Sequence, residues 1–147
     1  MPESQRRFED VWIGEPLPVL EFPLPVYRLV MAAAGTRDFT AIHHNDEYAR
    51  SVGAPSMYAN AGLLLGMWER TLRAYIGPAG TIRAIRDFRM VRFTLVGSVA
   101  RVEGRVLAVR PLDGAGVVEI ELRTVVDDTV TVGPGVAEVT LPHFSQS

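Results

Sequence analysis

The sequence contains no cysteine and no run of apolar residues long enough to cross a membrane. Without cysteine, neither a disulfide nor a thiolate zinc site is possible, and nothing indicates an oxidising compartment. The longest strongly apolar stretch, residues 59–68, is well short of the roughly 20 residues that a membrane-spanning helix requires. No apolar signal core follows Arg6 and Arg7 in the opening segment. We therefore expect a cytoplasmic protein with no membrane contact.

Basic residues are not in excess, because 15 of them stand against 17 acidic ones, for a formal net charge of -2. Generic nucleic-acid binding needs a marked basic excess, so we expect no nucleic-acid partner. The composition, with 48% hydrophobic and 22% charged residues, is that of a folded chain. A length of 147 residues allows one hydrophobic core and is too short for two domains of ordinary size. We therefore expect a single domain over residues 1–147.

The first half of the chain predicts an extended arm followed by helices. Residues 8–24 mix short apolar runs with glycine and proline, which suits an extended arm or edge strand and excludes a long helix. Pro25 is typical of a helix start, Gly35 of a helix end, and Asn45 of an N-cap. Further on, apolar residues cover most of a helical surface. We expect helices over residues 25–35, 46–52 and 59–75, the last being the longest and largely buried.

The second half of the chain predicts strands separated by turns. Glycine and aspartate punctuate it at Gly97, at Asp113-Gly114-Ala115-Gly116 and at Asp127-Asp128, each suited to a turn between antiparallel neighbours. No helices alternate with these strands, which argues against a parallel doubly wound sheet and for the α+β class, with one long helix on an antiparallel sheet. The predicted strands cover residues 81–91, 99–109, 117–126 and 130–141.

The polar segment at residues 36–44 carries the side chains best suited to chemistry. It connects two short predicted helices, and it holds a carboxylate at Asp38 and an imidazole at His43. An ionised aspartate can accept a proton from water, and a histidine, with a reference pKa of about 6.5, can give or take one near neutral pH. A loop can fold both toward one water. Spacing alone leaves open that Asp38 caps the local backbone and His43 packs under the long helix.

Several segments, in the same order along almost the whole chain, resemble the MaoC-like family of R-specific enoyl-CoA hydratases and acyl dehydratases. Asp38 and His43 match the aspartate and histidine of the family pattern D-x-N-P-apolar-H. Residues 8–15 are similar to the family's opening, and residues 96–99 and 104–106 to its V-G-D-x-V and G-x-V strand. The resemblance implies the hotdog fold, in which an antiparallel β-sheet wraps a long central helix. It also implies Asp38 and His43 as the catalytic acid/base pair.

The chain departs from the family pattern in several places. Thr40 and Ala41 replace the Asn and Pro of the motif, and Asn60-Ala61-Gly62 replaces a later H-G-M. In the family, the central helix begins at that H-G-M, and the N–H of its glycine binds the thioester carbonyl. The resemblance therefore implies that Asn60, Ala61 and Gly62 bind the substrate, with the backbone N–H of Ala61 as the donor. A backbone donor needs no particular side chain, so alanine can serve.

A further set of residues resembles a narrower branch, the small catalytic subunit of actinobacterial steroid side-chain enoyl-CoA hydratases. The shared features are residues 36–39, His43-His44, Asn60, Gly66, Arg70 and Gly77-Pro78. In that branch the small subunit pairs with a larger MaoC-like chain that lacks the acid/base pair. The resemblance implies a homodimer, or a heterodimer or heterotetramer with a second MaoC-like chain.

These resemblances imply hydration of a 2-enoyl-CoA to the 3-hydroxyacyl-CoA, in the degradation of cholesterol-type steroid side chains or of fatty acyl chains. No cofactor is required, and coenzyme A takes part only as a piece of the acyl-CoA substrate. Two alternatives stay open. One is a 3-hydroxyacyl dehydratase of fatty-acid or polyketide synthesis that acts on carrier-bound thioesters. The other is a non-catalytic hotdog subunit that completes a partner's acyl channel.

Two further groups of polar residues suggest other kinds of site. His43, His44 and Asp46 are potential metal ligands, but adjacent histidines point apart and no ligand cluster follows, so we expect no metal. An arginine series is suited to the phosphates of coenzyme A or a carrier-protein arm. On a strand, its three-residue spacing sends successive members to opposite faces, so we expect a solvated sheet surface or a subunit contact. Residues 81–91 are a candidate pairing edge. The series comprises Arg83, Arg86, Arg89 and Arg92.

Overall fold

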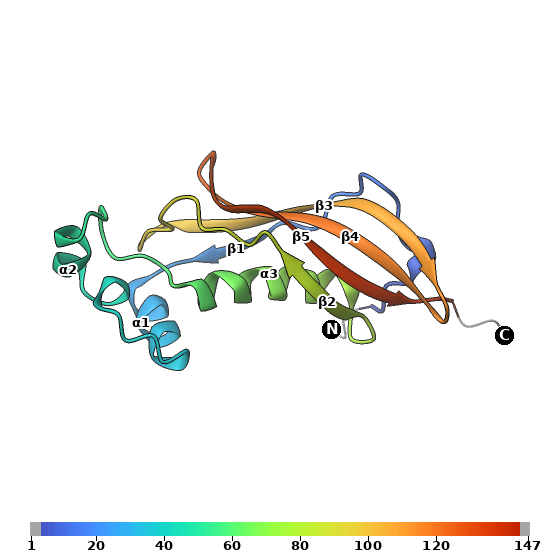
Figure 1. Ribbon diagram of the computed structural model, residues 1–147, viewed down its shortest axis with the longest axis horizontal. Coiled ribbons are helices and arrows are strands. Elements are labelled where there is room, and N and C mark those ends of the chain that lie inside the picture. Colours follow the sequence, from blue (N-terminus) through green and yellow to red (C-terminus); the bar gives the residue numbers. More distant parts are fainter. Residues whose placement is uncertain (1–3, 145–147) are drawn as a thin grey trace.

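A long helix lies along the inner face of a curved antiparallel sheet, as Figure 1 shows. The computed structural model describes residues 4–144. Their strands are β1 (Leu20–Pro23), β2 (Thr81–Arg86), β3 (Val99–Leu112), β4 (Ala115–Val126) and β5 (Thr129–Pro142). Their helices are α1 (Val26–Gly35), α2 (Asp46–Ser51) and α3 (Ala61–Ile76), with 3-10 turns at Phe8–Asp10 and Ala41–His43. The α+β class predicted from the sequence is confirmed.

The sheet has five strands in the order β1-β3-β4-β5-β2, and neighbouring strands run antiparallel. Its long middle consists of β3, β4 and β5, which follow one another in the chain through tight turns. The two short strands form the edges, with β1 paired to β3 and β2 paired to β5. Figure 1 shows α3 running beneath the middle strands, so the predicted helix on an antiparallel sheet is confirmed.

The sequence explains both ends of α3. The Asn60 side chain accepts a hydrogen bond from the amide of Leu63 at 2.9 Å, which caps the first turn. At the other end, Gly77 adopts a φ of 73°, a left-handed conformation that favours glycine and stops the helix. The helix predicted over residues 59–75 is confirmed and starts two residues later than expected. Within residues 4–144, no helix has the length and apolar character needed to span a membrane.

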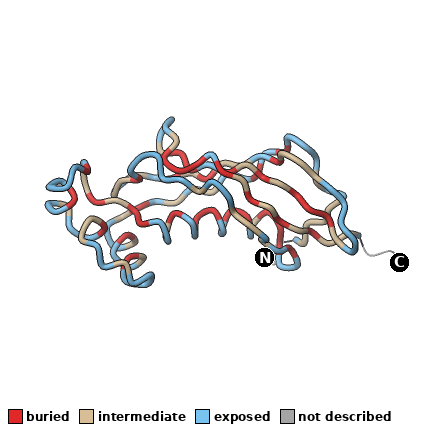
Figure 2. The backbone as a smooth tube through the Cα atoms, in the orientation of Figure 1, coloured by how far each residue is buried: buried red, intermediate tan, exposed pale blue. Residues whose placement is uncertain are grey.

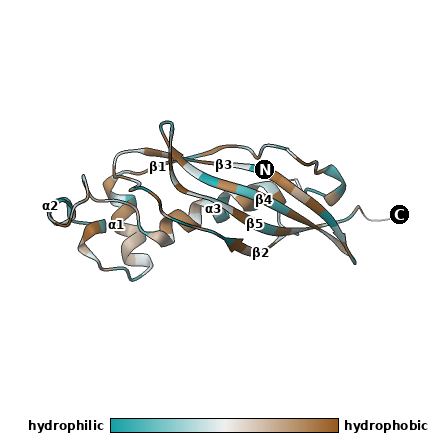
Figure 3. Ribbon diagram, turned by 45° about the horizontal axis from the view of Figure 1, so that its top comes forward, coloured by the Kyte–Doolittle hydropathy of each residue, from teal (hydrophilic) through white to brown (hydrophobic). Residues whose placement is uncertain are grey.

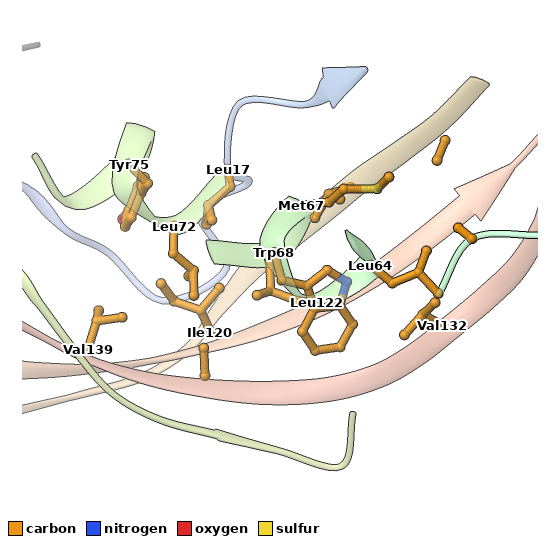
Figure 4. Packing of buried hydrophobic residues seen from close by; sticks show 14 of the residues in the cluster. Leu17, Leu64, Met67, Trp68, Leu72, Tyr75, Ile120, Leu122, Val132 and Val139 are labelled. Atoms are coloured by element: carbon orange, nitrogen blue, oxygen red, sulfur yellow. The ribbon is translucent and has the colours of Figure 1, made fainter. Parts of the chain in front are cut away.

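Apolar side chains of α3 belong to the hydrophobic core under the sheet, and Figure 2 shows buried positions recurring along this helix. Trp68 and Leu72 are completely buried, and in Figure 4 they lie against Ile120 and Leu122 of β4. The indole N–H of Trp68 donates to the hydroxyl of Thr124 at 2.9 Å, which satisfies both buried polar groups. Figure 3 shows polar and apolar residues interleaved along the strands. This alternation fits a sheet with one face on the core and one on solvent.

Most of the predicted elements are present. Residues 8–24 contain a 3-10 turn and then the edge strand β1, so the predicted extended arm or edge strand is confirmed. The two short predicted helices correspond to α1 and α2, and the last three predicted strands to β3, β4 and β5. The β3–β4 turn is tighter than expected and consists of Asp113-Gly114. Residues 1–3, part of the opening segment in which we expect no signal core, lie outside the described residues.

β2 is shorter than predicted. It ends at Arg86 instead of residue 91, because Asp87 takes a positive φ of 57° and turns the chain. The chain then runs beside β5 without forming a regular strand, and the amide of Val91 donates to the carbonyl of Thr131 at 2.9 Å. β2 nevertheless lies at the end of the strand order, where an edge strand is expected.

The arginines of β2 do not alternate as predicted. A bulge between Ile82 and Ala84 shifts the register against β5, so that Arg83 and Arg86 lie on the same face of the sheet. Both reach the carboxylate of Glu138, at 3.5 Å and 4.0 Å. The prediction that successive arginines point to opposite faces was therefore wrong for this pair. The ion pairs fit the expectation that this series lies on a solvated surface of the sheet.

Candidate active site

The Asp38 carboxylate and the His43 imidazole lie side by side, with Oδ2 of Asp38 3.1 Å from Nε2 of His43. Asp38 closely follows α1, where Arg37 takes a positive φ of 56° and reverses the chain. His43 closes the 3-10 turn Ala41–His43, which the sequence did not predict. The turn directs the imidazole inward, so the His43 side chain is 8% exposed and the Asp38 side chain 34%. The structure thus brings together the two residues of the predicted acid/base pair.

A backbone carbonyl fixes the orientation of the His43 ring. Nδ1 of His43 lies 2.8 Å from the carbonyl oxygen of Tyr58, and since a carbonyl only accepts, Nδ1 carries a hydrogen. Nε2 is therefore the nitrogen that gains or loses a proton, and it faces Asp38. The Tyr58 ring packs edge-on to the imidazole, with ring centroids 5.3 Å apart. With Nε2 protonated, the pair is an imidazolium beside a carboxylate, a combination that can transfer one proton.

Three neighbouring residues favour the ionised form of the Asp38 carboxylate. The Thr40 hydroxyl donates to Oδ1 at 2.9 Å and is the main reason that the pKa of Asp38 lies below its ordinary value. Burial opposes this decrease in pKa, and the charge of His43 and the amide of Asn60 add to it. Nδ2 of Asn60 lies 3.4 Å from Oδ2. Asp38 is therefore an anion at neutral pH and can accept a proton.

The first turn of α3 presents two backbone amides next to this pair. The first N–H groups of a helix have no partner inside it, and Asn60 satisfies only that of Leu63. Within the described chain, the amides of Ala61 and Gly62 make no hydrogen bond, and both residues are exposed. The positive end of the helix dipole strengthens their attraction for an oxygen that carries negative charge. Of the three predicted substrate-binding residues, Ala61 and Gly62 thus face outward, while Asn60 is only 4% exposed.

Two grooves flank the start of α3. The larger, about 630 Å³, passes Tyr58 and Ala59 and is otherwise lined mainly by apolar side chains of residues 90–95. The second, about 440 Å³, lies between α1 and α3 and passes Thr36 and Gly62. Gly62 lines the second groove, so an apolar group lying there would pass the first turn of α3. Both grooves are lined largely by apolar residues, which suits the apolar part of a ligand.

Sequence reasoning missed two partners of the acid/base pair, Thr40 and the carbonyl of Tyr58. Thr40 had a local signal, because aspartate side chains commonly bond to the residue two positions on, and Oδ1 of Asp38 accepts from both the amide and the hydroxyl of Thr40. Tyr58 had none, since its contribution comes from a backbone carbonyl that every residue type possesses, 15 residues away from His43. Only the fold brings that carbonyl to the ring.

The two adjacent histidines turn to different backbone carbonyls. His43 contacts the carbonyl of Tyr58, and Nε2 of His44 lies 3.3 Å from the carbonyl of Phe39. Across residues 4–144, no group of three or more His, Cys, Asp or Glu side chains is arranged to hold a metal ion.

The strand order and the buried helix define the class of fold. A five-stranded antiparallel sheet in the order β1-β3-β4-β5-β2, curved around one long helix, is the hotdog fold that the sequence resemblance implied. MaoC-like dehydratases and R-hydratases of solved structure share this fold over most of the chain. No family model matches the chain, and no curated protein matches it by sequence.

Three solved structures illustrate the likeness. A chain in the ChsH1-ChsH2 complex from Mycobacterium tuberculosis is 23% identical, with a TM-score of 0.77 over 90% of this chain and 98% of that one. The R-hydratase PhaJ1 from Pseudomonas aeruginosa is 19% identical, with a TM-score of 0.83 over 93% and 86%. The HadBC 3R-hydroxyacyl-ACP dehydratase complex from Mycobacterium tuberculosis is 16% identical, with a TM-score of 0.68 over 88% and 95%. At these identities, the likeness shows the fold alone.

Proposed function

We propose that the chain hydrates 2-enoyl-CoA thioesters to 3-hydroxyacyl-CoA thioesters. The observation that carries this proposal is the 3.1 Å contact between Asp38 and His43, close to the open first turn of α3. Addition of water to an enoyl thioester needs a base for the water, an acid for the α carbon and a donor for the carbonyl oxygen. Asp38, His43 and the amide of Ala61 are suited to these three roles. Coenzyme A is part of the substrate, and the reaction requires no further cofactor.

In the proposed reaction, one proton passes from water to Asp38 and another passes from His43 to the substrate. Asp38 removes a proton from a bound water, and the water oxygen forms a bond to C3 of the enoyl group. The electron pair of the double bond moves toward the thioester, and the amide of Ala61 stabilises the enolate oxygen. The protonated Nε2 of His43 then gives its proton to C2. Asp38 returns the proton it received to His43 across their 3.1 Å contact, which restores both groups. The reverse sequence dehydrates a 3-hydroxyacyl thioester.

Replacing Thr40 with valine is expected to shift the acid side of the pH profile. The variant cannot donate to the carboxylate, so the pKa of Asp38 rises toward its ordinary value. The proposed base must be ionised, and activity is lost as the pH falls through its pKa. In the variant, this loss therefore begins at a higher pH, while the rate well above that pKa changes little. The pH dependence of kcat/KM measures the shift. A Thr40→Ser control keeps the hydroxyl and should keep the profile; coinciding valine and wild-type profiles would count against Asp38 as the base.

We propose a large apolar acyl group, of the steroid side-chain or fatty acyl type. The groove of about 630 Å³ beside Tyr58 supports this, because the exposed side chains of Met90, Val91 and Phe93 contribute to its lining. The resemblance of residues such as Asn60 to the steroid branch points the same way. The alternative is dehydration of carrier-bound chains, which the structural likeness to the HadBC complex favours. A panel of short, long and steroid enoyl groups, each offered on coenzyme A and on a carrier protein, distinguishes the two.

We also propose that the active form is an oligomer containing a second hotdog chain. An exposed edge strand such as β2 is a template for pairing with another chain. Large apolar side chains are exposed on α1, on the loop of Asp38 and on the segment after β2, and a second chain lying there would bury them. They include Tyr27, Met31, Phe39, Met90 and Val91, each between 53% and 73% exposed. Two of the similar structures are themselves complexes.

The function and the partner are tested in one set of assays. Hydration of the enoyl-CoA panel is measured with the chain alone and after co-expression with a second MaoC-like chain, and the mass of each species is measured by light scattering. Activity that appears only in the mixed complex would identify a heteromer. A monomer that is fully active alone would contradict the oligomer. A chain without activity on any thioester in any pairing would contradict the enzyme and favour a non-catalytic subunit. The cytoplasmic location expected from the sequence stays a prediction.

A further inference from the structure

The side chain of Asn60 makes more contacts than a helix cap requires. Its Oδ1 accepts from the amide of Leu63 at 2.9 Å, which is the cap. Its Nδ2 donates to the hydroxyl oxygen of Thr36 at 2.8 Å and lies 3.4 Å from Oδ2 of Asp38. The residue is 4% exposed, so these partners are all within the protein. One buried amide therefore joins the start of α3 to the end of α1 and to the carboxylate.

The cap alone does not explain the asparagine at this position, because its amide nitrogen also serves Thr36 and Asp38. Serine, threonine and aspartate cap helices about as well as asparagine. Only a side-chain amide offers an acceptor to the helix and two donor hydrogens to oxygens on the other side. Asn45 caps α2 in the same way, through the amide of Tyr48 at 2.9 Å, and its side chain makes no other recorded contact in the described chain. The two caps thus differ in their amide nitrogens: that of Asn60 contacts Thr36 and Asp38, and that of Asn45 has no such partner in the described chain.

Close packing holds the end of α1 against the start of α3. The Thr36 hydroxyl, which accepts from Asn60, itself donates to the carbonyl of Ala32 at 2.7 Å and so stays fixed to α1. A Cβ placed on Gly62 would lie 2.8 Å from Cγ2 of Thr36, so that a larger residue there would displace the Thr36 side chain. The glycine in the first turn of α3 therefore allows the end of α1 to approach. This contact holds Asn60 between the helix and the carboxylate.

We propose that Asn60 is a positioning residue, whose amide holds the Asp38 carboxylate toward His43 and in a fixed relation to the neighbouring amide of Ala61. This inference rests on the proposed function, because it assigns the base and the carbonyl donor to one connected unit. The titratable group that faces the carboxylate is His43, at 3.1 Å, while Thr36, Thr40 and Asn60 are neutral. Asn60 touches no reacting atom in this scheme. It sets where the base and the carbonyl donor lie relative to each other, and misplacement by about 1 Å costs on the order of 10²-fold in rate.

An Asn60→Asp variant tests the proposal, because aspartate keeps the cap acceptor and removes the two donors. We expect a folded protein with a lower melting temperature, because a second carboxylate is buried beside Asp38. We also expect a kcat lower by about 10²-fold and a smaller change in KM. The new carboxylate beside Asp38 also disfavours its ionised form. The acid limb of the pH profile, and the NMR titration of the Asp38 side chain, therefore move to higher pH. Asn45→Asp makes the same substitution at the matched cap of α2 and should leave kcat and the titration unchanged.

Two results would overturn the proposal. One is an Asn60→Asp protein with wild-type kcat and an unmoved Asp38 titration; the other is an equal response from Asn45→Asp. Should Asn60→Asp fail to fold, Asn60→Ser keeps a cap acceptor without adding charge, and wild-type kcat in that variant would overturn the proposal as well. The NMR titration needs no substrate. An inactive wild type would therefore reject the proposed function, while the Asp38 titration of Asn60→Ser, which removes the amide without adding charge, still decides whether Asn60 acts on Asp38: a shift to higher pH is expected, and an unmoved titration would overturn the proposal.

Discussion

An Asp38→Asn variant is expected to fold like the wild type and to hydrate enoyl-CoA about 10²–10⁴ times more slowly. Asparagine has nearly the size of aspartate, and the Asp38 side chain is 34% exposed, so the hydrophobic core does not depend on it. A neutral amide cannot take a proton from water, and it cannot return one to His43. The measurement is the initial rate of hydration at equal concentrations of wild type and variant, with the partner chain present.

The control for this variant is Asp128→Asn in the turn between β4 and β5. Asp128 is exposed and far along the chain from the site, so the same change of charge there should leave the rate unchanged. Circular dichroism and the melting temperature compare the folded state of all three proteins. Wild-type turnover by Asp38→Asn would remove the carboxylate from the chemistry and leave a hotdog subunit that serves a partner's site.

An Ala61→Pro variant is expected to keep α3 and to lose about 10²–10³-fold in kcat. Ala61 is the first residue of the helix, the position where proline fits because its missing N–H has no partner inside the helix. Asn60 already has the extended conformation that a residue before proline prefers, with φ of -79° and ψ of 165°. The substitution therefore removes the proposed donor to the enolate oxygen with little other change to the backbone.

Val26→Pro is the matched control, since Val26 is the first residue of α1 and is 55% exposed. Both variants should melt near the wild-type temperature, and only Ala61→Pro should lose activity. The rates are compared at saturating substrate, because the proposed bond strengthens as charge develops on the oxygen. An Ala61→Pro protein that keeps both its helix and its kcat would show that another group stabilises this oxygen.

The long helix and the middle strands could be predicted because each carries a strong local pattern. The apolar residues of α3 recur at helical spacing, and glycine or aspartate marks the turns that join β3, β4 and β5. Two features of β2 could not be predicted from local patterns. Its bulge between Ile82 and Ala84 arises from pairing with β5, and its end depends on the positive φ of Asp87. Both features are set by tertiary context.

The reacting groups of the candidate site could be predicted from the sequence, but the residues and turns that position them could not. Asp38 and His43 stood out by residue type and by resemblance, but their 3.1 Å contact depends on the turn after Arg37 and on the 3-10 turn that ends at His43. Thr40 stands where the family pattern has asparagine, and its hydroxyl donates to the carboxylate. Asn60 was expected to contact substrate, and its side chain instead lies buried between α1 and α3. Contacts between segments distant in sequence decide these details.

The most direct test of the acid/base assignment is the fate of the water oxygen. A 2-enoyl-CoA is incubated in isotopically labelled water with the chain and a second MaoC-like chain, and the product is analysed by mass spectrometry. We expect a 3-hydroxyacyl-CoA that carries one labelled oxygen with the wild type, and no product above background with Asp38→Asn. Equal labelling by the two proteins, or no labelled product from any enoyl thioester in any pairing, would contradict the assignment of Asp38 and His43.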